Sequence, residues 1–191
     1  MKAGGSVNKS VTSKAEVLRV SRELIQTNGW ASISIRAVAA ACDVSVGTIY
    51  NYFDSKSDLI SATIESVWCD IFHSPENDAC FQDAVSCITW LYQCMEYGSK
   101  VYPGFFSLHS AGFIALDKQD AIQLMKKTWA HISYGICATL KKDPNVRPDA
   151  FNVSFSPEKF SQALFSLVLT DLMNQHYDPE IPLQIIRRCV Y

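Results

Sequence analysis

The sequence predicts an all-α protein of about nine helices, in which an N-terminal helix-turn-helix unit precedes a larger helical domain. Apolar residues recur at spacings of three and four along nearly the whole chain, which is the period of an amphipathic helix. Helix-capping residues precede most of these segments, and no segment shows the alternation of a strand. Because 48% of the 191 residues are apolar, the chain can build a core, and general disorder is excluded.

The first 72 residues are expected to form four helices, long, short, short and long, at residues 12–28, 34–42, 45–53 and 55–72. Each begins near a serine whose hydroxyl can cap the exposed N–H groups of the first turn: Ser13, Ser34, Ser45 and Ser55. Gly29 suits the left-handed conformation that ends a helix. Asp43 lies between the short helices, where a tight turn calls for positive φ, which Asp tolerates better than most residues.

The rest of the chain is expected to form longer helices separated by loops at residues 73–79 and 143–155. One helix begins near Phe81 and is broken between Gly98 and Gly104, and a Phe-rich helix follows at residues 105–116. Further helices are expected at residues 122–140, from Ser156, and from Asp178 near the end. The expected organisation is a disordered tail (1–11), a helix-turn-helix domain (12–55) and a second domain (56–191) that the helix at 56–72 connects to the first.

Charge is unevenly distributed along the chain. The formal net charge is −2, yet residues 1–57 contain seven bases and four acids. A basic head on an acidic body is typical of a protein that contacts phosphate at one end. No apolar run is long enough for a membrane span, and the N-terminus lacks a signal-peptide pattern. A cytoplasmic protein without a membrane partner is therefore expected.

The seven cysteines are expected to be free thiols in apolar sites, because their number is odd and no C-x-x-C occurs. Cys80, Cys87 and Cys94 recur every seven residues, which places neighbours about 10.5 Å apart along a helix and too far apart to share a metal. Cys69 and His73 could form only half a metal site. No catalytic set or phosphate-binding loop is found, so no enzyme activity, metal or cofactor is expected.

The two short helices and the turn between them predict a helix-turn-helix motif whose second helix reads the major groove of DNA. Its polar residues can contact phosphates or base edges: Thr48, Tyr50, Asn51 and Tyr52. Val46 can contact a thymine methyl group, and Gly47 lets the backbone approach closely. Lys56 can pair with a phosphate. Packing within the motif is the alternative for Tyr50, whereas Ile49 and Phe53 are expected in the core.

This stretch resembles the DNA-binding domain of TetR-type transcriptional regulators. The resemblance covers about residues 12–60 and includes the pattern V-S-x-G-T-x-Y-x-x-F-x-x-K-x-x-L from Val44 to Leu59. It implies a homodimer in which the third helix reads operator DNA. It also implies phosphate contacts by Lys14 and Ser34, and a base or phosphate contact by Arg36. The implied DNA-binding set is Lys14, Ser34, Arg36, Ser45, Val46, Gly47, Thr48, Tyr50, Asn51, Tyr52 and Lys56.

The chain departs from the family pattern at three positions. Ile33 stands where Thr or Ser is common, which removes a possible phosphate contact. Asp43 replaces the usual turn glycine and adds a negative charge near DNA. Val46 stands where a basic or small residue is frequent. The fold pattern survives these changes, and the operator sequence is left open.

The resemblance also implies that the second domain binds a small-molecule effector. Candidate lining residues are aromatic and polar residues on its helices: Trp90, Tyr92, Cys94, Tyr97, Phe105, Phe106, His109, Phe113, Trp129, Ser133 and Phe165. Ordinary core packing is the alternative for each aromatic residue.

The helix that begins at Ser156 is apolar on almost every side near residues 163–169, which predicts that a partner subunit covers one face. Expected interface residues are Phe160, Leu164, Leu167, Val168, Leu172, Gln175 and Ile185. The preferred function is a repressor that an effector releases from its operator. The alternatives are a co-activator that acts through a protein partner and, more distantly, an enzyme that uses Cys94 or His109.

Overall fold

The computed structural model describes residues 12–72, 81–106 and 118–191. All regular structure in these ranges is helical, so the predicted all-α class is confirmed. The chain divides into two compact units, Met1–Val67 and Trp68–Tyr191. The expected tail at residues 1–11 and most of the expected helix at 105–116 lie outside the described residues.

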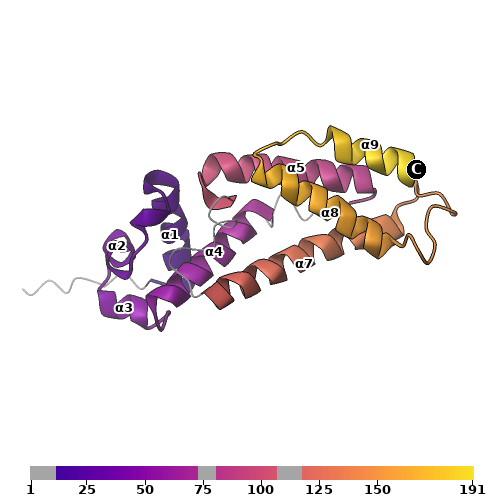
Figure 1. Cartoon of the computed structure of the whole chain (residues 1–191). Helices are drawn as coiled ribbons and strands as arrows, with labels where there is room; N and C mark the ends of the chain where they lie inside the picture. The colour runs from indigo at the N-terminus through magenta and orange to yellow at the C-terminus, as the bar shows by residue number, and fades with distance from the viewer. Residues whose placement is uncertain (1–11, 73–80, 107–117) are drawn as a thin grey trace, which may run out of the picture. The chain divides into compact units, whose positions relative to one another are not determined.

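The first unit contains a long helix, a 3-10 turn, two short helices and most of a second long helix: α1 (Lys14–Asn28), η1 (Trp30–Ser32), α2 (Ile35–Ala41), α3 (Val46–Tyr50) and α4 (Lys56–Phe72) (Figure 1). The four predicted serine caps are confirmed. Each serine Oγ accepts a hydrogen bond from the backbone N–H three residues later, with N···O distances of 3.0–3.1 Å. Local sequence signals therefore set where these helices begin.

The turn between α2 and α3 has the predicted conformation, with φ of 53° at Asp43. The expected length of α3 was wrong, because the helix ends at Tyr50 and not at Phe53. The N–H groups of both Tyr52 and Phe53 bond to the carbonyl of Ile49. This turn carries the Phe53 ring into the core, where it is 3% exposed. The core of this unit also contains the fully buried Val17, Ile25, Val38, Ile49, Leu59 and Ile64.

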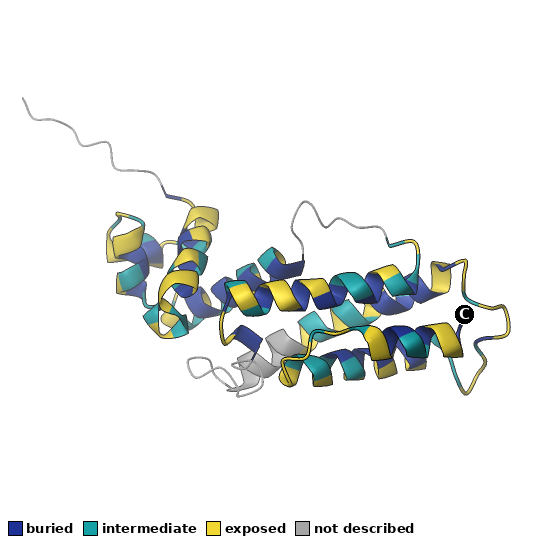
Figure 2. Ribbon diagram, turned by 90° about the horizontal axis from the view of Figure 1, so that it is seen from above, coloured by how far each residue is buried: buried dark blue, intermediate teal, exposed yellow. Residues whose placement is uncertain are grey.

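In the residues that the structure describes, the second unit is built around α5 (Ala84–Val101), α7 (Lys118–Lys142), α8 (Pro157–Met173) and α9 (Glu180–Cys189). α7 packs along α8, and α5 packs against α7 and α9 (Figure 1). Figure 2 shows that these helices carry both buried and exposed residues around their surfaces. Within the described ranges, no helix is both long enough and apolar enough to cross a membrane.

The bounds of α5 differ from the expectation at both ends. The helix begins at Ala84, after the cap residue Asp83, so Phe81 precedes it. It continues through Gly98, which was expected to break it, and ends at Val101. Gly98 is buried, and a Cβ at this position would lie 2.7 Å from Cδ1 of Ile71 and 3.0 Å from Cζ of Phe106. The glycine therefore permits close packing against the end of α4 inside the helix.

We expect Gly98→Val to lower the free energy of unfolding of the second unit by about 1–3 kcal/mol, because the added methyl groups overpack a buried contact. Gly135→Ala is the matched control. Gly135 lies on α7, and a Cβ there would have no neighbour within 4 Å. Alanine is the better helix former, so the control should be neutral or stabilising. Thermal unfolding followed by circular dichroism measures the melting temperature of each variant. If Gly98→Val melted at the same temperature as Gly135→Ala, the packing role of Gly98 would be refuted.

A buried carboxylate joins three parts of the second unit. Asp143, which directly follows α7, is 6% exposed. Its Oδ2 accepts hydrogen bonds from the backbone N–H of Ala84, at 2.7 Å, and from the hydroxyl of Tyr191. Its Oδ1 accepts one from the N–H of Asn145, at 2.9 Å. The start of α5, the end of α7 and the last residue of the sequence are thus connected through one side chain.

Candidate nucleic-acid interface

The helix α3 presents an exposed face next to a buried anchor. Ile49 is fully buried, whereas Val46 is 39% exposed and Tyr50 is 50% exposed. Gly47 and Asn51 are also exposed. Val46 and Tyr50 thus give α3 a small exposed surface that is partly apolar and partly aromatic. The face therefore suits a groove that offers both methyl groups and polar base edges.

The hydroxyl groups at the starts of the short helices serve the protein backbone. Ser34 caps α2 through the N–H of Ala37. Ser45 caps α3 through the N–H of Thr48, and its Oγ lies 2.9 Å from Oγ1 of Thr48. Ser45 is exposed and Thr48 is half-buried. These residues consequently fix the first turn of α3, and a phosphate contact would be an additional role.

Three exposed cations lie on the elements around α3. Arg36 is in the first turn of α2, and Lys56 is the first residue of α4. Lys14, the first residue of α1, has its Nζ 5.3 Å from the centroid of the Phe53 ring. A cation over an aromatic face is held by the ring quadrupole while its remaining surface stays open to an anion. All three are exposed, and their contact with phosphates stays a prediction.

Tyr52 makes a contact that sequence reasoning missed. It is half-buried, and its hydroxyl donates a 2.6 Å hydrogen bond to the backbone carbonyl of Thr12, which lies 40 residues earlier in the sequence. Thr12 is itself only 7% exposed. The hydroxyl thus connects the turn after α3 to the residue where the chain enters α1. Its donor hydrogen is used inside the unit, so Tyr52 is less suited to phosphate than expected.

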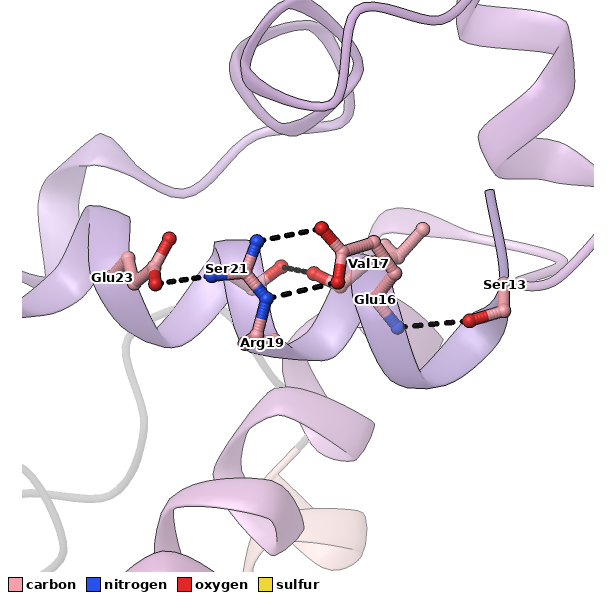
Figure 3. Close-up of polar contacts among 6 residues, drawn as sticks. All are labelled: Ser13, Glu16, Val17, Arg19, Ser21 and Glu23. Atoms are coloured by element: carbon pink, nitrogen blue, oxygen red, sulfur yellow. Dashed lines mark hydrogen bonds and ion pairs between the residues drawn. The ribbon is translucent and has the colours of Figure 1, made fainter. Parts of the chain in front are cut away.

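On α1, an ion-pair cluster neutralises an arginine (Figure 3). The guanidinium of Arg19 bonds to the carboxylates of Glu16 and Glu23. The hydrogen bonds from Arg19 lower the pKa of Glu16, which therefore remains ionised. The cluster carries two negative charges and one positive charge, so this part of α1 offers no excess positive charge to DNA.

The described part of the first unit is not basic. Residues 12–67 contain five basic and six acidic side chains, which gives a net charge of −1. Two of the acids, Asp43 and Asp54, lie in the turns on either side of α3 and are exposed. The positive excess expected at this end of the chain therefore comes from Lys2 and Lys9, in the segment before Thr12.

Several candidate effector residues belong to one aromatic cluster of the second unit, in which the Phe72 ring contacts both Trp68 and Trp90. Phe105 and Phe106 pack edge-on against Trp68 and are almost fully buried. Trp90 contacts Phe81, and Trp129 contacts Phe165. Tyr92 is buried and Tyr97 is exposed. His109 and Phe113 lie outside the described residues. The arrangement serves core packing for several of these residues, which is the alternative the sequence left open.

The polar side chains among the candidate effector residues differ in burial and in hydrogen bonding. The Nε1 of Trp90 is buried and has no hydrogen-bond partner among the described residues. Ser133 is half-buried on α7. Burial raises the pKa of the Cys94 thiol to about 12, so the thiol stays protonated. A protonated, buried thiol is a poor nucleophile, which gives no support to an enzymatic role for Cys94.

Within the single chain, the expected interface residues divide into two sets. Phe160, Leu164 and Val168 are at most 3% exposed, because the chain's own helices cover them. Leu167, Leu172 and Ile185 are half-buried and Gln175 is exposed. On the outer side of α8 lie mainly small or unbranched exposed residues: Gln162, Ala163, Ser166, Thr170 and Met173. Of the expected interface residues, the second set remains available to a partner, as does this outer side of α8.

Part of the first unit is similar in sequence to known bacterial regulators. Residues 17–63 match the family model described as bacterial regulatory proteins, tetR family. The HTH-type transcriptional regulator UidR of Escherichia coli strain K12 is 38% identical over 52 residues, which are 27% of this chain and 26% of UidR. The match thus spans about a quarter of that relative's length.

Solved structures of low sequence identity share the fold over most of the chain. The reduced form of NemR from E. coli has a TM-score of 0.60 at 16% identity, covering 92% of this chain and 95% of NemR. The transcriptional regulator FadR from Bacillus subtilis, solved in complex with stearoyl-CoA, has a TM-score of 0.53 at 16% identity, covering 94% of this chain and all of FadR. The C-terminal helices are therefore similar in architecture to those of known regulators.

Proposed function

We propose that this chain, whose N-terminal unit belongs to the tetR family of bacterial regulatory proteins, is a homodimeric repressor that a small molecule releases from operator DNA. The observation that carries the proposal is the exposed face of α3, where Val46 and Tyr50 project beside the buried Ile49. A helix held in this way by its neighbours can enter the major groove with its side chains already positioned.

Recognition is assigned to two classes of contact. Val46 and Asn51 face the bases, while Tyr50, Lys14, Arg36 and Lys56 contact phosphates. Ser34 and Ser45 cap the first turns of α2 and α3, and Thr48 supports the second cap through its hydroxyl, so these residues hold the helices that approach the DNA. Phosphate contacts set affinity and register, whereas base contacts set sequence preference.

A homodimer is supported by the surface of α8 and α9. One recognition helix contacts only a few base pairs, so a two-fold dimer that reads two half-sites is the usual solution. Half-buried Leu167, Leu172 and Ile185 leave apolar area exposed in a single chain. The small residues Ala163 and Ser166 on the outer side of α8 would let a partner helix approach closely.

An effector is supported by the second unit. FadR, which shares the fold, was solved in complex with stearoyl-CoA, and an aromatic region here contains the indole N–H of Trp90, for which the described part of the chain supplies no hydrogen-bond partner. A ligand that offers apolar surface and one hydrogen-bond acceptor would satisfy that group. The ligand releases DNA if it binds the two dimer states with different affinities.

The test is enrichment of genomic fragments from the source organism by the purified protein, followed by anisotropy titration on a short duplex from the enriched pool. Lys14, Arg36 and Lys56 give six phosphate contacts in a dimer, so log K should fall with log salt with a slope of about −5 or steeper. The complex should contain two chains. A scrambled duplex of equal length is the control, and equal binding to both duplexes would overturn the proposal.

A further inference from the structure

The start of α1 is held by the turn that follows α3. The hydroxyl of Tyr52 donates a 2.6 Å hydrogen bond to the carbonyl of Thr12. The next residue, Phe53, places its ring centroid 5.3 Å from Nζ of Lys14. Two consecutive residues after α3 thus fix two points of the chain where it enters α1.

These contacts bury the parts that hold the lysine and leave the lysine itself accessible. Thr12 is 7% exposed and Phe53 is 3% exposed, whereas Lys14 is exposed. An unrestrained lysine side chain loses rotamer freedom when it binds an anion. A lysine whose backbone and ammonium are already held loses less, so the two contacts favour binding of an anion by Lys14.

The hydrogen-bond chemistry of Tyr52 argues for an indirect role. A phenol has one donor hydrogen, and the hydrogen of Tyr52 is donated to the Thr12 carbonyl. The oxygens of a DNA phosphate diester only accept hydrogen bonds. Tyr52 can therefore donate to a phosphate only by giving up its bond to a buried residue, which has a free-energy cost.

We propose that Tyr52 and Phe53 are positioning residues for DNA binding, which hold the ammonium of Lys14 in place for a phosphate before the DNA arrives. The inference rests on the proposed function, in which Lys14 contacts phosphate. It changes the expected role of Tyr52 from a phosphate contact to a residue that acts through Lys14. Because α3 ends at Tyr50, the same turn connects this phosphate contact to the recognition helix.

The first test uses the whole chain without DNA and observes Lys14 by NMR. Its Hε protons should resonate upfield of those of Lys127, an exposed lysine of α7, because the face of the Phe53 ring shields them. The resonance is assigned by its absence from the spectrum of Lys14→Gln. Tyr52→Phe should move it toward the position of Lys127, since the chain before Lys14 is released. Tyr50→Phe, which removes a hydroxyl from an exposed residue of α3, should leave it unchanged.

The second test is a double-mutant cycle on the enriched duplex. Tyr52→Phe should weaken binding by about 2- to 5-fold in the wild-type background. In the Lys14→Gln background it should have no effect, because no ammonium remains to be positioned. Tyr50→Phe is the matched control. The Tyr50 hydroxyl is assigned to a phosphate directly, so its loss should weaken binding by the same factor in both backgrounds.

The salt dependence separates the lysine from the tyrosine. Lys14→Gln removes two phosphate contacts from a dimer, so the slope of log K against log salt should become less steep by about 1.8. Tyr52→Phe should keep the wild-type slope, because Lys14 still reaches its phosphate, although with lower affinity.

The outcomes distinguish this inference from the proposed function. If Tyr52→Phe weakens binding by the same factor in both backgrounds, Tyr52 acts independently of Lys14, and the positioning role is overturned while the proposed function stands. A Lys14 resonance that is not shifted in the wild type, or that Tyr52→Phe leaves in place, overturns it as well. If the wild type binds neither the enriched nor the scrambled duplex at low salt, the proposed function fails and the positioning role with it.

Discussion

Asp143→Ala is expected to lower the free energy of unfolding of the second unit by about 2–4 kcal/mol, since it leaves three hydrogen-bond donors without their acceptor, one of them on the buried Ala84 and one on the half-buried Tyr191. These donors are the N–H groups of Ala84 and Asn145 and the hydroxyl of Tyr191. Water cannot readily replace the carboxylate, because Asp143 is only 6% exposed. The loss should therefore be large for a single substitution outside the apolar core.

Tyr191→Phe separates the parts of this network. Burial, followed by the hydrogen bond to Asp143, raises the pKa of Tyr191 to about 12, so its hydroxyl remains a donor at neutral pH. Removing that hydroxyl deletes one bond and leaves the other two, with an expected loss of about 1 kcal/mol. The double variant should be no less stable than Asp143→Ala alone. Urea unfolding followed by tryptophan fluorescence measures each value, and a wild-type midpoint for Asp143→Ala would contradict the assignment.

The sequence was most informative where a residue interacts with others close to it in the chain. The serine caps and the positive φ of Asp43 depend on atoms within three or four residues, so their spacing predicts them. The same holds for Ser156 and Pro157 at the start of α8. Helix starts and turns in the described ranges were accordingly predicted within a few residues.

Sequence reasoning failed where the partner of a residue is distant. Glycine often ends a helix, so Gly98 was expected to break α5. Its actual role is to permit close packing against Ile71 on another helix. The bond from Tyr52 to Thr12 spans 40 residues, and no local spacing indicates it. Asp143 was expected only to begin a loop. Each of these depends on tertiary contacts, which periodicity does not encode.

The helix α8 shows a further limit of periodicity. Its apolar residues indicated that every side must be covered, and a partner subunit was invoked for one face. The structure shows that the chain's own helices already bury Phe160, Leu164 and Val168. A hydrophobic pattern reveals that a face is covered, but it does not reveal which chain covers it. The proposed partner subunit would therefore contact residues that remain exposed or half-buried, such as Leu167.

Gly47→Glu is expected to weaken binding to the enriched duplex by about 100-fold or more while leaving the fold intact. Gly47 is the second residue of α3 and is exposed, and a Cβ there would meet only Ser45 Oγ, at 3.7 Å. The free protein therefore has room for a side chain. An acidic residue at a helix start is also favourable to the helix. Against DNA, the same carboxylate faces phosphates at close range, and such like-charge contacts cost several kcal/mol, with each 1.4 kcal/mol equal to about tenfold.

Two comparisons identify the cause of that loss. Glutamine has nearly the same size as glutamate but no charge. The difference in affinity between Gly47→Glu and Gly47→Gln therefore measures charge repulsion. The loss of affinity that Gly47→Gln shows relative to the wild type measures the steric conflict with the DNA. Gly135→Glu makes the same substitution at an exposed glycine of α7, where a Cβ has no neighbour within 4 Å. It should bind as the wild type does, because Gly135 belongs to the second unit and not to the helix-turn-helix. If Gly47→Glu bound the enriched duplex within about threefold of Gly135→Glu, α3 would not be the element that enters the groove, since a carboxylate there would then face no phosphate.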